Sequence, residues 1–153
     1  MSIPPVGSRA PAFELDADDG TTVSLAGLRG RIVVLYFYPK DDTSGCTTEA
    51  CGIRDAWAAI RRSGAVVLGV SPDSVASHER FKRKYSLPFP LLADPDHRVA
   101  EAYGAWGEKS MYGRKYHGIL RTTFVIDPDG IVRHVFERVK PKGHAEEILA
   151  ALR

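Results

Sequence analysis

The sequence predicts an α/β fold in which helices cover both faces of a mixed central sheet. Short apolar runs, rich in β-branched and aromatic residues, alternate along the chain with longer segments of helical periodicity. The runs "RIVVLYFY" (31–38) and "AVVLGVS" (65–71) flank one such helical segment, which is the order of a parallel strand–helix–strand unit. The chain has 153 residues and no repeat or long linker, so we expect one domain over residues 1–153.

The composition is that of an ordinary globular protein. Hydrophobic residues make up 44% and charged residues 26%, and the net charge of +2 implies no acidic partner. The basic run "ERFKRKY" (79–85) is better explained as the solvated face of a helix than as a nucleic-acid patch. No apolar segment is long enough to cross a membrane, and the N-terminus lacks the apolar core of a signal peptide. We therefore expect a protein of the reducing cytoplasm that binds neither a membrane nor nucleic acid.

The first elements are three expected strands. Residues 12–28 read as a short strand pair that turns around Asp19 and Gly20. The run 31–38 is continuously apolar, which is typical of a strand covered on both faces, and Pro39 ends it.

A helix is expected next, from about residue 45 to residue 62, and Ser63 and Gly64 close it. The second apolar run, 65–71, then forms the strand parallel to the first.

Shorter elements follow in the middle of the chain. We expect a helix over 74–85, a short strand over 88–95 and a short helix over 97–104 that Gly104 ends. The segment 107–118 is polar and punctuated by glycine, so we expect a surface excursion there.

The C-terminal part predicts a hairpin and a last helix. Residues 119–127 and 130–139 read as strands around "DPDG", whose residues suit a type I turn. Residues 144–153 read as an amphipathic helix. A mixed sheet with helices on both faces and an added N-terminal strand pair is the thioredoxin-like form of α/β.

The two cysteines, Cys46 and Cys51, both lie on the helix expected over 45–62. One apolar stripe of that helix, which we expect to be buried, consists of Cys46, Ala50, Ile53, Trp57 and Ile60. Cys51 lies about 140° around the helix axis from Cys46, and their Cα atoms would be roughly 8.6 Å apart. Disulfides tolerate little beyond about 7 Å, so the two thiols cannot pair while the helix is intact.

Several explanations of the two thiols compete. A structural disulfide is disfavoured by the helix geometry and by a reducing compartment. A zinc site needs two further ligands, and no close pair of zinc-binding spacing occurs among His78, His97, His117, His134 and His144. The spacing is also not that of a C-x-x-C dithiol. Two unrelated buried thiols remain an alternative, because cysteine packs as a small hydrophobe.

The position of Cys46 favours a functional thiol. It lies at a helix N-terminus just past the end of a buried strand, where open α/β sheets bind ligands. Thiols at helix N-termini ionise more readily than free thiols. Thr43 offers a hydroxyl nearby, and Arg121 lies early in a strand that we expect beside this site. Donors around a thiolate suit cleavage of a peroxide O–O bond, because the leaving oxygen gains negative charge.

The segment "PKDDTSGC" matches the P-x3-T-x2-C signature of the peroxiredoxins. The longer stretch "YFYPKDDTSGCTTEACGIRD" resembles the bacterioferritin-comigratory, or Q-type, subfamily. The likeness continues through "LPFPLLADP" and "YGRKYHGILRTTFVIDPDG", and thus covers nearly the whole chain.

The resemblance implies a role for each residue of the signature. Cys46 would be the peroxidatic cysteine, which attacks the peroxide and becomes a sulfenic acid. Thr43 and Arg121 would orient the peroxide, Pro39 would shield the pocket from water, and Glu49 would position Arg121.

The resemblance also implies that Cys51 is the resolving cysteine, which forms an intramolecular disulfide with Cys46. Thioredoxin or a similar dithiol would reduce that disulfide. The first helical turns must unwind for the pairing, and we expect Gly52 to act as the hinge. Ser44 departs from the pattern, because many relatives have proline there, so the loop before Cys46 is expected to be less rigid.

The expected activity is the reduction of hydrogen peroxide and organic hydroperoxides by a monomer that needs no metal, flavin or haem. Two alternatives stay open at this point. One is a dithiol–disulfide oxidoreductase or redox sensor on the same fold, which would leave Thr43 and Arg121 without a task. The other is a binding module of this fold whose thiols are incidental.

Overall fold

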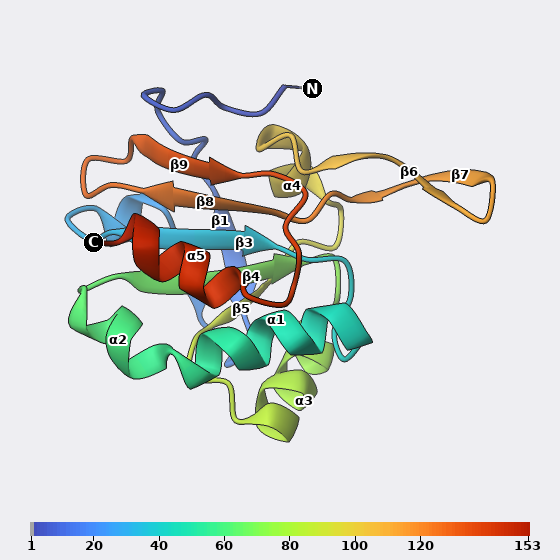
Figure 1. Cartoon of the computed structure of the whole chain (residues 1–153), viewed down its shortest axis with the longest axis horizontal. Coiled ribbons are helices and arrows are strands. Elements are labelled where there is room, and N and C mark those ends of the chain that lie inside the picture. The colour runs from blue at the N-terminus through green and yellow to red at the C-terminus, as the bar shows by residue number, and fades with distance from the viewer. Residues whose placement is uncertain (1) are drawn as a thin grey trace.

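A computed structural model describes residues 2–153 (Figure 1). The main sheet has seven strands in the order β2-β1-β5-β4-β3-β8-β9, and β6 and β7 form a separate two-stranded sheet. The strands are β1 (Glu14–Ala17), β2 (Thr22–Ser24), β3 (Val33–Phe37), β4 (Val66–Ser71), β5 (Leu91–Ala93), β6 (Trp106–Met111), β7 (Arg114–Ile119), β8 (Thr122–Ile126) and β9 (Val132–Phe136). The helices are α1 (Ser44–Asp55), α2 (Trp57–Arg62), α3 (Val75–Tyr85), α4 (Arg98–Ala102) and α5 (His144–Ala151).

The central strand β3 organises the sheet. It runs parallel to β4 and antiparallel to β8, and all five of its residues are buried. Val33, Leu35 and Phe37 pack into one hydrophobic cluster, whereas Val34 and Tyr36 pack into another on the opposite face. Alternate side chains of a strand point to opposite faces, so a strand that is apolar throughout needs cover on both sides.

The mixed α/β sheet predicted from the sequence is confirmed, although its two faces are covered unequally. Helices α1, α2, α3 and α5 lie along one side of the sheet (Figure 1) and bury Ile53, Phe81 and Ile148 against it. The other face is covered by α4 and by the N-terminal segment around Phe13. Across residues 2–153, no helix combines the length and the apolar character that a membrane crossing requires.

The single helix expected over 45–62 is wrong, because the chain forms two helices, α1 and α2. Their junction is Ala56, which has φ −94° and ψ 9°. Its N–H donates to two carbonyl oxygens, those of Gly52 and Ile53, at 3.2 Å each, which is the shared hydrogen bond of a helix end. The turn leaves Trp57 half-buried against Phe89, with ring centroids 5.9 Å apart.

The surface excursion expected over 107–118 is confirmed, and its conformation, which the sequence did not indicate, is a β-hairpin. The segment is exposed, and β6 and β7 pair in register from Trp106 opposite Ile119 to Met111 opposite Arg114. The turn residues Tyr112 and Gly113 have φ values of 52° and 77°. Two consecutive left-handed residues make the tight turn that suits the twist of a hairpin. The resulting arm extends away from the main sheet (Figure 1).

The other expected elements are confirmed with shifted ends. The N-terminal strand pair is β1 and β2, which pair around the turn at Asp19 and Gly20. The hairpin around "DPDG" is β8 and β9, and Asp127 accepts hydrogen bonds from the N–H groups of Asp129 and Ile131.

The start of α1 allows a prediction about Ser44, the first residue of that helix. Thr43, which precedes it, has φ −93° and ψ 159°, the extended backbone favoured before proline. Proline suits the first helical position because the N–H that it lacks has no helical partner there. Ser44→Pro should therefore raise the free energy of unfolding by about 0.4–1 kcal/mol, chiefly by restricting the unfolded chain. Urea unfolding of the reduced protein measures the change.

Thr47→Pro is the matched control in the same helix. The Thr47 N–H donates to the Thr43 carbonyl at 2.8 Å, so its loss should cost about 3 kcal/mol. A Ser44→Pro variant destabilised as strongly as Thr47→Pro would contradict this description of the first turn.

Candidate active site

Cys46 lies in the first turn of α1, immediately beyond the C-terminal end of β3, and is 1% exposed. Its side chain belongs to the hydrophobic cluster that contains Tyr36 and Tyr38 of the preceding strand and loop. Cys51 is half-buried further along the same helix, and both cysteines are free thiols. The intact helix thus separates the two sulfur atoms.

The pairing of β3 with β8 places Arg121 beside Cys46. Thr122 pairs with Phe37, the last residue of β3, so Arg121 lies next to the loop that follows β3. The Arg121 Nη2 atom lies 3.4 Å from the Cys46 Sγ atom, and its Nη1 atom donates to Glu49 Oε1 at 2.6 Å. Glu49 reaches the same guanidinium because residues three apart share one face of a helix.

Gly45, which the sequence analysis did not single out, makes room for this contact. A Cβ atom at Gly45 would lie 3.2 Å from Arg121 Nη2 and 3.3 Å from the side chain of Pro141. The guanidinium therefore passes directly over the backbone of the first helical turn. The Arg121 carbonyl also accepts a hydrogen bond from the Val139 N–H at 3.0 Å, which fixes the arginine backbone.

Glu49 is a buried carboxyl that is only partly paired. It is 1% exposed, and its second oxygen, Oε2, has no hydrogen-bond partner within residues 2–153. Burial raises the pKa of Glu49 to about 7, although the neighbouring Arg121 opposes the rise. Burial tends to lower the pKa of Arg121, but Glu49 and Cys46 raise it overall, so the guanidinium stays charged.

Thr43 and Pro39 lie on the loop between β3 and α1, residues 38–43, which we call the active-site loop. Thr43 is exposed and Pro39 is half-buried. The Thr43 hydroxyl donates to the Lys40 carbonyl at 2.8 Å, so its single hydrogen is already used. The structure thus brings Arg121 into direct contact with both Cys46 and Glu49, whereas Thr43 and Pro39 belong to the loop that leads to Cys46.

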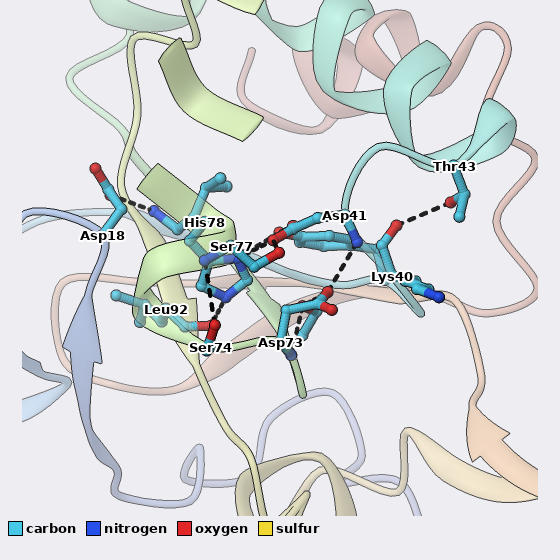
Figure 2. Close-up of polar contacts among 12 residues, drawn as sticks. Asp18, Lys40, Asp41, Thr43, Asp73, Ser74, Ser77, His78 and Leu92 are labelled. Atoms are coloured by element: carbon cyan, nitrogen blue, oxygen red, sulfur yellow. Dashed lines mark hydrogen bonds and ion pairs between the residues drawn. The ribbon is translucent and has the colours of Figure 1, made fainter. Parts of the chain in front are cut away.

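A second polar cluster, behind the active-site loop, was not found by sequence reasoning (Figure 2). His78 is fully buried on α3, and its Nδ1 atom lies 2.7 Å from Asp41 Oδ2. Asp73 accepts a hydrogen bond from the Asp41 N–H at 2.8 Å. The two partners of Asp41 are 32 and 37 residues away in the sequence, so no local pattern pointed to them.

Asp41, Asp73 and His78 are the one group within residues 2–153 whose ligand atoms are close enough to hold a metal ion. Their facing atoms are already engaged in hydrogen bonds. Asp41 Oδ1 accepts from the Tyr38 hydroxyl at 2.6 Å, and Asp73 Oδ2 accepts from the Ser71 hydroxyl at 2.6 Å. We therefore interpret the cluster as a hydrogen-bond network.

The chain is similar to known peroxiredoxins along nearly its whole length. The profile of the AhpC/TSA family matches residues 6–135. Peroxiredoxin Bcp of Bacillus subtilis is 47% identical over 148 residues, which cover 97% of this chain and 94% of that protein.

Solved structures of peroxiredoxins are also similar to this chain. A cysteine-to-serine mutant of PrxQ from Xylella fastidiosa superposes with a TM-score of 0.93 at 36% identity, covering 99% of this chain and 97% of that one. The bacterioferritin comigratory protein of Xanthomonas campestris, studied for its alkyl peroxide reduction activity, superposes with a TM-score of 0.87 at 41% identity, covering 92% and 89%.

The matching profile spans most of the chain, and the relatives match it from end to end. Together with a buried cysteine at a helix N-terminus against an arginine, these likenesses identify the chain as a member of the AhpC/TSA family and, within it, a peroxiredoxin of the Bcp or PrxQ type.

Proposed function

We propose that Cys46 is the thiol with which this peroxiredoxin reduces peroxides. The observation that carries the proposal is the 3.4 Å contact between Arg121 Nη2 and the buried Cys46 Sγ. A cation at that distance stabilises the thiolate, which is the nucleophilic form of cysteine. The thiolate sulfur donates an electron pair to the terminal peroxide oxygen, so that an S–O bond forms and the O–O bond breaks. The sulfur becomes a sulfenic acid, and the leaving oxygen takes a proton to depart as water or an alcohol.

Arg121 acts on the leaving oxygen as well as on sulfur. Its five donors form a planar fork that can contact more than one acceptor, and Glu49 occupies only one edge of it. As the O–O bond breaks, negative charge moves to the departing oxygen, which the guanidinium stabilises most strongly in a water-poor pocket. When Glu49 is protonated, the Cys46 thiolate is the single anion that contacts Arg121.

Thr43 serves as an acceptor in this scheme. Its hydroxyl hydrogen is used on the Lys40 carbonyl, so its oxygen lone pairs remain for the O–H of a protonated peroxide. Pro39 at the other end of the loop carries no N–H and helps to keep water from the reacting sulfur.

We further propose that Cys51 resolves the sulfenic acid. Its sulfur attacks the Cys46 sulfur, a disulfide forms, and the hydroxyl leaves as water with the Cys51 proton. The first turns of α1 must unwind for this step, because the intact helix keeps the two thiols apart. Thr43 makes no side-chain cap at the start of α1, and Gly52 lies just past Cys51, so this part of the helix is weakly stabilised.

The substrates that this site suits are hydrogen peroxide and small organic hydroperoxides, and an external dithiol such as thioredoxin would regenerate the two thiols. The monomer, expected from the resemblance, and the reducing cytoplasm, expected from the sequence, both stay predictions. A dithiol–disulfide oxidoreductase is the weaker alternative, because it leaves the contact between Arg121 and Cys46 without a task.

The two cysteine roles are separated by intact mass after rapid mixing with one equivalent of hydrogen peroxide. The wild-type protein should lose two hydrogens, Cys51→Ser should stop at the sulfenic acid or higher oxides, and Cys46→Ser should stay unchanged. Wild-type protein that reacts no faster than free cysteine would refute the assignment of Cys46.

Replacing Arg121 tests the electrostatic argument. Arg121→Gln should slow the reaction of Cys46 with hydrogen peroxide by about 10²–10³-fold, because it removes the donors that face sulfur and the leaving oxygen. Arg121→Lys keeps the positive charge but lacks the planar fork of donors, so its rate should lie between those of the wild type and Arg121→Gln. Quenched-flow mass measurement gives the rates, and an unchanged rate in Arg121→Gln would remove Arg121 from the mechanism.

Protonation of Glu49 should make the free energy of unfolding depend on pH. The folded protein holds this proton up to a pKa of about 7, whereas the ordinary value is 4.5, so the carboxyl costs stability as pH rises through that window. Between pH 4 and pH 8, the unfolding free energy of the wild type should fall by up to about 3 kcal/mol relative to Glu49→Gln.

The comparison is made in a Cys46→Ser background, so that the neighbouring thiol does not titrate. The protein called wild type here therefore carries Cys46→Ser alone, and its partner carries Cys46→Ser together with Glu49→Gln. Urea unfolding at several pH values gives the difference. If the wild type gained stability over Glu49→Gln with rising pH, the ion pair with Arg121 would outweigh burial and the argument would be wrong.

A further inference from the structure

We propose that Asp41 and His78 position the active-site loop for the reaction of Cys46 with peroxide, by binding residues 38–43 to helix α3. The inference rests on the proposed role of Cys46. In the part of the chain that the structure describes, no hydrogen bond or ion pair joins Asp41 or His78 to Cys46 or Arg121, so the two residues act through the loop and not on the reacting atoms.

Asp41 lies between Pro39 and Thr43 and holds the loop through its backbone and its carboxylate. Its N–H donates to Asp73 Oδ2 at 2.8 Å. Its carboxylate accepts from the Tyr38 hydroxyl at 2.6 Å and from the Ser77 hydroxyl at 2.8 Å. Figure 2 shows Asp73, which precedes α3, and Ser77 of α3 pointing toward Asp41. Such a buried and fully bonded aspartate leaves the middle of the loop little freedom to move.

His78 supplies the rigid side of the contact. It is fully buried, and its Nε2 atom lies 2.9 Å from the Leu92 carbonyl oxygen. A carbonyl oxygen only accepts, so Nε2 carries a hydrogen. Nδ1 faces Asp41 Oδ2 at 2.7 Å, and this second contact also requires a hydrogen between nitrogen and oxygen. One hydrogen therefore lies between Nδ1 and Asp41 Oδ2, and hydrogen bonds hold both nitrogens of the ring.

The next residue of the loop is held by the same helix. The Asp42 carboxylate accepts from the Tyr85 hydroxyl at 2.7 Å and pairs with Lys84 at 2.7 Å. Asp42 has φ 57°, a left-handed conformation that is unusual for a residue other than glycine. Contacts with α3 thus hold the chain reversal between Asp41 and Thr43.

This reversal determines where α1 begins. The Thr43 carbonyl accepts the Thr47 N–H at 2.8 Å and so closes the first turn of the helix, in which Cys46 lies. A shift of Asp41 would therefore move Thr43 and the start of the helix together. Displacement of a reacting group by about 1 Å can reduce a rate by about 100-fold.

The test compares two variants at Asp41. Asp41→Ala removes the acceptor of three side-chain donors and should slow the reaction of Cys46 with hydrogen peroxide by about 10-fold or more. Asp41→Asn can donate from its amide to Nδ1 of a neutral imidazole while its oxygen still accepts from Tyr38. It should therefore recover most of the wild-type rate, which a general loss of stability would not explain.

Asp127→Ala is the matched control for stability. Asp127 is also buried and accepts two backbone N–H groups, but it lies near the N-terminal end of β3, at the far end from Cys46. The Asp127→Ala substitution should lower the free energy of unfolding without changing the rate at which Cys46 reacts with hydrogen peroxide. Asp73→Ala is the second variant if Asp41→Ala does not fold. It leaves the Asp41 carboxylate in place but removes the acceptor of the Asp41 N–H and of the Ser71 hydroxyl, and it should also slow the reaction severalfold.

Quenched-flow mass measurement of all variants, beside wild type and Cys46→Ser, separates the outcomes. Slow Asp41→Ala, recovered Asp41→Asn and unaffected Asp127→Ala support the inference. A wild-type rate in Asp41→Ala, or in Asp73→Ala where Asp41→Ala is not folded, overturns it. Equal slowing by Asp127→Ala, or no recovery in Asp41→Asn, also overturns it. If wild type itself is as slow as Cys46→Ser, the proposed role of Cys46 fails, and not the positioning argument alone.

Discussion

The contacts of the Arg121 guanidinium are the interaction on which the arrangement of the candidate active site depends. The guanidinium lies between a buried thiol and a buried carboxyl, and its charge contacts both of them. Burying a charged group is costly unless it is paired, and the contacts of Arg121 with Glu49 and Cys46 offset part of that cost. The fold supplies that geometry by pairing β8 with β3, which brings residue 121 to the loop that carries residue 46.

The main sheet and the placement of Cys46 follow from patterns that are local in the sequence. The apolar runs that form β3 and β4 leave few alternatives to buried strands, and "DPDG" specifies its own turn. The break at Ala56 leaves no such trace, because alanine is the best helix former and so gives no local sign of a helix end. The arm formed by β6 and β7 was missed because its stability comes from backbone pairing, whereas its side chains show no apolar face.

The network around Asp41 and His78 marks where sequence reasoning ended for the site. Neither residue stands out in the sequence. Asp41 follows Lys40 in the segment "PKDDTSGC", and His78 lies within a basic, amphipathic helix. Only the fold shows that the helix passes behind the active-site loop and is bound to it at Asp41 and at Asp42. Relations of this kind depend on the tertiary structure, and single-residue patterns carry no sign of them.

The junction at Ala56 has a consequence for how far a local rearrangement can spread. Helical hydrogen bonds cooperate along an uninterrupted segment, so melting of one turn weakens its neighbours within that segment. Because α1 ends at Asp55, opening of its first turns need not extend to α2, where Ile60 is fully buried in the core. The chain thus contains two cooperative units where one long helix was expected. The unwinding of α1 that we propose for disulfide formation can thus stay within the first unit, while the second keeps Ile60 in the core.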